Sequence, residues 1–83
     1  MRVLYFASLR QRIGVGEEDV APPDDVRDVA GLVAWLRARS PAHEAAFAGT
    51  SRVRAAVNQD FAQLGDPVGA GDEVAFFPPV TGG

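Results

Sequence analysis

A small α+β domain, in which a mixed sheet curves around one main helix, is predicted by three features of this sequence. Two short apolar runs, residues 3–7 and 73–77, have the β-branched and aromatic composition of central strands. Between them lies one apolar stripe with helical spacing, from Val29 to Leu36. The length of 83 residues allows one compact domain with a single modest core.

The N-terminal third predicts a strand, a short helical piece and a weaker second strand. Residues 3–7 form the first strand, and residues 8–13 favour one or two helical turns that Gly14 stops. A short strand is expected around Val20 and ends before Pro22. The first strand is apolar on both faces, which indicates a place in the middle of the sheet.

The main helix is predicted to begin after Asp28, whose carboxylate can accept hydrogen bonds from the backbone of the first turn. Its stripe consists of residues spaced i, i+3, i+4 and i+7: Val29, Leu32, Val33 and Leu36. Trp35 lies at the edge of this stripe, which favours a core or rim role. The helix is expected to end before Pro41, and a shorter helical piece at residues 43–48 to close at Gly49.

The C-terminal part predicts the remaining strands. Residues 52–57 form a strand, residues 58–60 a turn, and Phe61 lies on a short return strand. Residues 69–72 form a turn before the last strand, which Pro78 and Pro79 terminate. This order fits a β-grasp, in which the first and last strands lie side by side at the centre of the sheet.

Composition excludes several classes of function. The net charge of −3 argues against nucleic acid as a partner, and no apolar run approaches the roughly 20 residues that span a bilayer. Cysteine is absent, so a side chain cannot carry sulfur, and the one histidine, His43, predicts a surface or helix-start role rather than a metal or other cofactor site. We expect a cytoplasmic protein that binds no cofactor itself.

The last four residues predict a flexible tail, 80–83, that follows a domain of residues 1–79. Gly82 and Gly83 have little propensity to stay folded, and four extended residues reach roughly 13 to 14 Å. Glycine has no Cβ, so the tail can enter a narrow channel and present an unobstructed carboxylate to another protein's active site. Such a carboxylate becomes a group carrier after activation, typically as an acyl-adenylate.

Adjacent aromatic residues predict an apolar patch near the root of this tail. Phe76 and Phe77 must point to opposite faces of their strand, as must Tyr5 and Phe6. One member of each pair therefore faces away from the main helix. Exposed apolar patches of this kind commonly mark a protein interface.

The C-terminal sequence GDEVAFFPPVTGG, residues 71–83, and the opening VLYFASLR, residues 3–10, resemble the small subunit of molybdopterin synthase, the MoaD-type sulfur carriers. The resemblance extends over essentially the whole chain and is weakest at residues 14–28 and 40–51. It implies a ubiquitin-like β-grasp fold. It also implies that an E1-like adenylating enzyme uses ATP to activate the Gly83 carboxylate, after which sulfur replaces AMP to leave a thiocarboxylate.

The same resemblance implies that the thiocarboxylate enters the large synthase subunit, which supplies the catalytic side chains. There its sulfur attacks a cyclic pyranopterin monophosphate, and two deliveries build the molybdopterin dithiolene. The family assembles as a heterotetramer of two small and two large subunits. Partner-binding positions map onto three aromatic residues and the approach to the terminus: Phe6, Phe61, Phe77, Pro78, Pro79, Val80 and Thr81.

Three other functions stay open on the sequence alone. Carriers that supply sulfur for thiamin thiazole also end in Gly-Gly, although they are usually shorter and lack the FFPPV approach. A ubiquitin-like protein modifier would join Gly83 to lysines of target proteins, but this chain has no lysine of its own for side-chain self-linkage. The third alternative is an interaction module with an inert tail.

Overall fold

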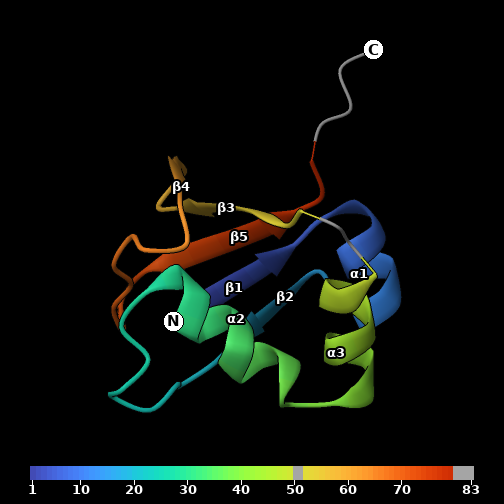
Figure 1. Cartoon of the computed structure of the whole chain (residues 1–83), viewed down its shortest axis with the longest axis horizontal. Helices are drawn as coiled ribbons and strands as arrows, with labels where there is room; N and C mark the ends of the chain where they lie inside the picture. The colour runs from blue at the N-terminus through green and yellow to red at the C-terminus, as the bar shows by residue number, and fades with distance from the viewer. Residues whose placement is uncertain (50–51, 80–83) are drawn as a thin grey trace.

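The computed structural model describes residues 1–49 and 52–79, which form five strands and three helices (Figure 1). In chain order these are β1 (Arg2–Tyr5), α1 (Ala7–Ile13), β2 (Glu17–Asp19), α2 (Val29–Arg37), α3 (Pro41–Ala48), β3 (Arg54–Val57), β4 (Asp60–Ala62) and β5 (Glu73–Phe77).

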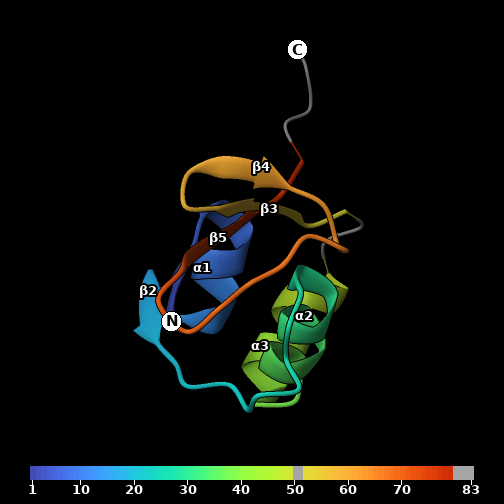
Figure 2. The ribbon, with the colours of Figure 1, turned by 90° about the vertical axis from the view of Figure 1, so that its left-hand side faces the viewer.

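One mixed sheet has the strand order β2-β1-β5-β3-β4. β1 and β5 pair in parallel at its centre, with Val3 beside Val74 and Tyr5 beside Phe76, and the other neighbours are antiparallel. The helices lie on one face of the sheet (Figure 2). The predicted β-grasp and the central pairing of the first and last strands are therefore confirmed.

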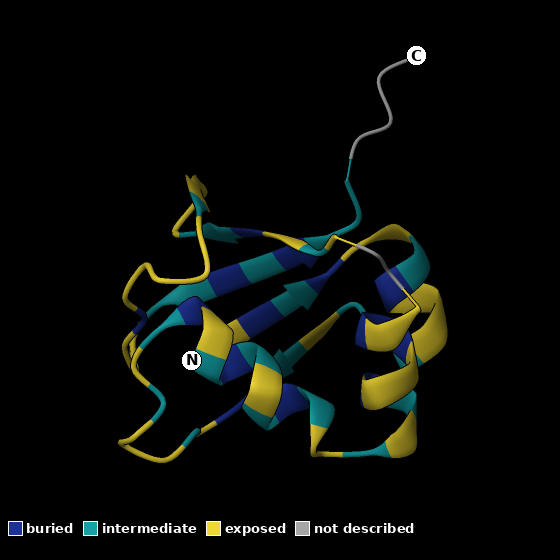
Figure 3. Ribbon diagram, viewed as in Figure 1, coloured by how far each residue is buried: buried dark blue, intermediate teal, exposed yellow. Residues whose placement is uncertain are grey.

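The core lies between that face and the helices. Alternation along β1 and β5 turns Val3, Tyr5, Val74 and Phe76 inward, and all four side chains are buried. They pack with apolar residues from the three helices, among them Leu9, Leu32, Leu36 and Phe47. Figure 3 shows buried segments alternating with less buried ones along β1 and β5 and recurring in the helices.

The helix ends follow from local sequence. Asp28 is the N-cap of α2, and its Oδ1 accepts from the backbone N–H of Gly31 at 2.8 Å. Ser40 is the N-cap of α3 and accepts from the backbone N–H of His43, while Pro41 occupies the first helical turn. Gly14 ends α1 with a φ of 95°, the left-handed conformation that glycine adopts without a Cβ clash.

Several predicted boundaries differ from the structure for identifiable reasons. α2 ends at Arg37 rather than just before Pro41, because Ser40 must be extended in order to cap α3. β2 lies just before Val20, because residues 17–19 are the ones in register with β1. β1 ends at Tyr5 because the chain turns at Ala7, whose φ is 52°. β3 begins at Arg54, two residues later than predicted.

The predicted turn between β3 and β4 is a two-residue hairpin loop. Asn58 and Gln59 both have positive φ, 51° and 73°, as the tight turns that match the twist of a hairpin require. Val57 pairs with Asp60 across it. This turn brings Phe61 back beside β3, so the predicted short return strand is confirmed.

Replacing Phe76 by alanine tests the packing between the sheet and the helices. The Phe76 ring contacts Phe47 edge to face, with centroids 5.4 Å apart, and is fully buried. We expect Phe76→Ala to lower the free energy of unfolding by about 3 to 5 kcal/mol, measured by urea denaturation. Leu64→Ala removes a side chain that is 62% exposed and should change it by less than about 0.5 kcal/mol. Equal losses in the two variants would contradict this packing.

Candidate functional site

The face of the sheet turned away from the helices carries an apolar strip. The strand register places Leu4 and Ala56 on either side of Ala75, and Phe61 opposite Ala56. Phe77 lies two residues beyond Ala75 on the same face of β5. Together with Phe6, which directly follows β1, these residues form the outer patch: Leu4, Phe6, Ala56, Phe61, Ala75 and Phe77.

Phe6 extends this strip beside the last residue of β5. Its backbone N–H donates to the carbonyl of Phe76 at 3.1 Å, which continues the parallel ladder one step beyond Tyr5. Tyr5 is buried whereas Phe6 is 48% exposed. The expectation that one residue of each aromatic pair faces away from the helices is therefore confirmed.

Phe61 and Phe77 contact each other within the outer patch. Their ring centroids are 6.1 Å apart with an interplanar angle of 60°, an edge-to-face contact. Phe61 is 83% exposed, so most of its ring area is available to a partner. The structure thus brings the three aromatic partner positions of the sequence analysis, Phe6, Phe61 and Phe77, onto one face.

The outer patch ends where the chain leaves the sheet. Pro78 and Pro79 directly follow Phe77, are half-buried and are the last described residues. The other predicted site residues lie outside the described residues: Val80, Thr81, Gly82 and Gly83. The structure therefore describes the platform and the start of the approach to the terminus.

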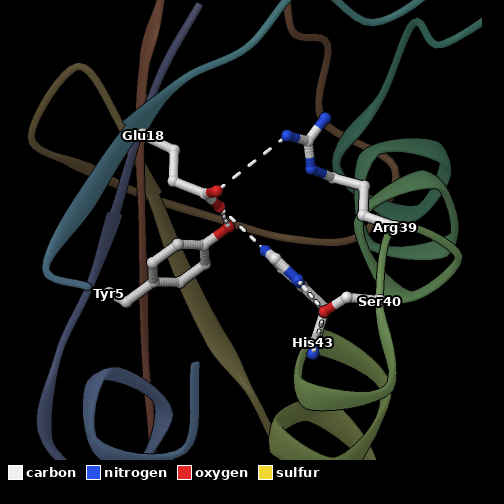
Figure 4. Close-up of polar contacts among 5 residues, drawn as sticks. All are labelled: Tyr5, Glu18, Arg39, Ser40 and His43. Atoms are coloured by element: carbon white, nitrogen blue, oxygen red, sulfur yellow. Dashed lines mark hydrogen bonds and ion pairs between the residues drawn. The ribbon is translucent and has the colours of Figure 1, made fainter. Parts of the chain in front are cut away.

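A polar cluster on the inner side of the sheet was not predicted. Figure 4 shows the Glu18 carboxylate between Tyr5, Arg39 and His43. Its Oε2 accepts from the Tyr5 hydroxyl at 2.7 Å and lies 2.8 Å from His43 Nε2, and its Oε1 lies 3.9 Å from Arg39. His43 Nδ1 is 2.7 Å from Ser40 Oγ.

This cluster corrects the surface role predicted for His43. The residue does begin a helix, but it is only 7% exposed, because Glu18 provides a partner 25 positions earlier in the chain. Both ring nitrogens have partners, and the cluster joins edge strand β2 to α3. Its role in the described structure is to hold the helix layer against the sheet.

The same contacts perturb the ionisation of two members of the cluster. Burial raises the pKa of Glu18, but hydrogen bonds from His43 and Tyr5, together with the charges of His43 and Arg39, outweigh it and leave that pKa below its ordinary value. Burial, followed by the hydrogen bond to Glu18, raises the pKa of the Tyr5 hydroxyl far above its ordinary value. Tyr5 is therefore a neutral donor to an ionised carboxylate.

The arrangement suits docking better than catalysis by this chain. The outer patch consists of apolar side chains, while the titratable cluster lies on the other side of the sheet and its members bind one another. Among residues 1–49 and 52–79, no three His, Asp or Glu side chains are placed to hold a metal ion. None of the helices in these ranges has the length and apolar composition needed to cross a membrane.

Comparisons with known proteins agree on one family. A model described as the ThiS family matches residues 3–83. The chain is 40% identical to the molybdopterin synthase sulfur carrier subunit of Escherichia coli strain K12, covering 100% of this chain and 99% of that protein. It is 36% identical to the protein of the same name from Mycobacterium tuberculosis, and the match covers 100% of this chain and 96% of that protein.

A solved structure extends the similarity to another kind of protein. SAMP1 of Haloferax volcanii, a small archaeal modifier protein, superimposes with a TM-score of 0.77 at 32% identity. The match covers 100% of this chain and 98% of that one.

Acidification tests the polar cluster. A lowered pKa means that ionised Glu18 stabilises the fold above the unfolded value, ordinarily 4.5, and that this contribution is lost as the pH falls through the folded value. At pH 7 we expect Glu18→Gln to be less stable than the wild type by about 1 kcal/mol. The difference should shrink as the pH falls below 4.5. Urea denaturation across this range measures it, and a difference independent of pH would contradict the role of Glu18.

Removal of the Phe61 ring tests the outer patch. Since this side chain is 83% exposed, Phe61→Ala should leave the urea midpoint nearly unchanged. Binding to a protein partner that covers the patch should weaken by about tenfold or more, measured by calorimetry. Arg27→Ala, in the loop before α2, serves as the control and should bind normally. Unchanged affinity of Phe61→Ala for a partner that binds the wild type would rule out this face as the interface.

Proposed function

This chain belongs to the ThiS family, and from that membership we propose that it is the sulfur carrier subunit of a molybdopterin synthase. The observation that carries the proposal is the similarity over the full chain to proteins of that name, with a family match that runs to Gly83. The outer patch supports it, because a carrier needs a surface on which a second protein can dock beside the approach to the terminus.

The proposed chemistry begins at the Gly83 carboxylate. An E1-like adenylating enzyme transfers AMP from ATP to this carboxylate and releases pyrophosphate. A sulfur donor then displaces AMP, which leaves a thiocarboxylate. This chain binds no cofactor in the scheme, because the ATP belongs to the activating enzyme.

The second stage takes place on the large subunit of the synthase. The thiocarboxylate sulfur forms a bond to a carbon of cyclic pyranopterin monophosphate while a carbon–oxygen bond of that carbon breaks and the oxygen substituent leaves. The resulting thioester joins Gly83 to the substrate. Water must cleave the bond between the acyl carbon and sulfur, which leaves sulfur on the substrate and restores the carboxylate. Two carriers deliver the two sulfurs of the dithiolene, in keeping with a heterotetramer of two small and two large subunits in the cytoplasm.

Each part of this chain has a defined task in the proposal. Phe6, Phe61 and Phe77 dock the platform, and Pro78 and Pro79 restrict the backbone and direct the approach away from the sheet. Val80 and Thr81 span the distance to the active site. Gly82 and Gly83 offer a carbonyl without a neighbouring side chain, so that the attacking atom has access.

A second candidate is a ubiquitin-like protein modifier, which the similarity to a small archaeal modifier protein favours. In that case the activated Gly83 would form isopeptide bonds with lysines of target proteins. Gly-Gly remnants on cellular lysines that depend on this chain would support this function. A carrier for the thiamin pathway is a third candidate, and the partner captured by co-purification distinguishes it.

Intact-mass analysis tests the proposed chemistry. After incubation with the activating enzyme, ATP and a sulfur donor, we expect one terminal oxygen of the wild type to be replaced by sulfur. Gly83→Val should reduce the rate of this replacement by about 100-fold, because a side chain beside the carbonyl displaces the reacting atoms.

Gly71→Val is the matched control for the Gly83 variant. A Cβ built at Gly71 meets no atom within 4 Å, so this variant should fold and react like the wild type. Failure of the wild type to gain sulfur, or normal reaction of Gly83→Val, would refute the assignment of the terminus.

A further inference from the structure

A groove with a volume of about 640 Å³ opens between α2 and the β3–β4 hairpin. Its lining includes three residues of the core or packed against it: Val29, Val33 and Phe76. The basic residues among its lining are Arg37, Arg52 and Arg54, and no acidic residue among residues 1–49 and 52–79 lines it. In a chain with eleven acidic residues and a net charge of −3, this concentration of positive charge is a local feature.

Two of the three arginines have no partner within the described structure. Arg37 is held by Glu44, with Nε 2.7 Å from Oε2. Arg52 and Arg54 are exposed, and neither side chain forms a hydrogen bond or an ion pair with any residue of 1–49 or 52–79. In the described structure two guanidinium groups at the border of the groove therefore lack a partner, and each is able to bind a carboxylate with two parallel hydrogen bonds.

The groove is continuous with the outer patch. Phe61 belongs to both, and Arg54 lies directly opposite Phe77 in the register of β3 and β5. Opposite residues of antiparallel strands share a face, so the Arg54 side chain borders the patch at the end from which the chain leaves the sheet. A protein that covers Phe61 and Phe77 therefore reaches the groove as well.

We propose that the groove receives an acidic segment of the large subunit, with carboxylates at Arg52 and Arg54 and an apolar side chain over Val33 and Leu64. This inference rests on the proposed function. We assign the acidic segment to the large subunit rather than to the activating enzyme, because the relatives are named as subunits of a synthase. The pairing fixes the direction in which the platform docks, since an arginine buried without a carboxylate would weaken the complex.

The affinity of the full-length chain for the large subunit, measured at about 50 mM and about 500 mM salt, tests this inference. We expect Arg54→Glu and Arg52→Glu each to weaken binding by about tenfold at low salt, and the loss to shrink at high salt. Leu64→Ser removes an exposed apolar side chain from the groove and should weaken binding at both salt concentrations. Circular dichroism and urea denaturation verify that each variant is folded.

Arg27→Glu is the matched charge reversal, because Arg27 is exposed and lies in the loop before α2, outside the groove. It should change the affinity by less than about twofold. If Arg27→Glu weakens binding as much as Arg54→Glu does, the effect comes from net charge alone and the inference is overturned. The inference is also overturned if all groove variants bind the large subunit normally. This holds even if the adenylating enzyme activates those variants more slowly than the wild type. A wild type that does not bind the large subunit refutes the proposed function and this inference together.

Discussion

The structure depends on the parallel pairing of β1 with β5 at the centre of the sheet. Alternation along β5 turns Val74 and Phe76 into the core and Ala75 and Phe77 outward, so the residues that stabilise the fold and those available to a partner belong to one five-residue strand. The chain leaves the sheet immediately after Phe77. The rigidity of the core is thereby coupled to the position of the docking surface and of the approach to Gly83.

The strand alternation and the helix caps could be predicted from sequence because they depend on neighbours within a few positions. Val29, Leu32 and Leu36 form the buried side of α2. As expected, α2 begins after Asp28 and α1 ends at Gly14. The buried position of His43 could not be predicted, because its partner Glu18 lies on a separate strand far away in sequence. The groove could not be predicted either, because it combines α2 with residues that follow α3 and lie far from α2 in sequence.

The two faces of the sheet divide the molecule by function. On the inner face the titratable groups Tyr5, Glu18 and His43 bind one another and hold the helices in place. On the outer face Phe6 and Phe61 remain exposed although each could be replaced by a polar residue at little cost to stability. A chain that exposes aromatic rings and keeps its ionisable cluster inside is suited to presenting a group to another protein's catalytic residues. Arg52 and Arg54, which have no partner among residues 1–49 and 52–79, extend this surface with charge that a partner can complement.

The most direct test of the carrier function is a single-turnover reaction that omits the activating enzyme. The chain, prepared with a thiocarboxylate at Gly83, is mixed with the large subunit and cyclic pyranopterin monophosphate, and the dithiolene product is quantified. We expect two carriers to return to the carboxylate form for each dithiolene formed, and the carboxylate form to yield no product. Absence of dithiolene from the thiocarboxylate form in the presence of an active large subunit would contradict the carrier function.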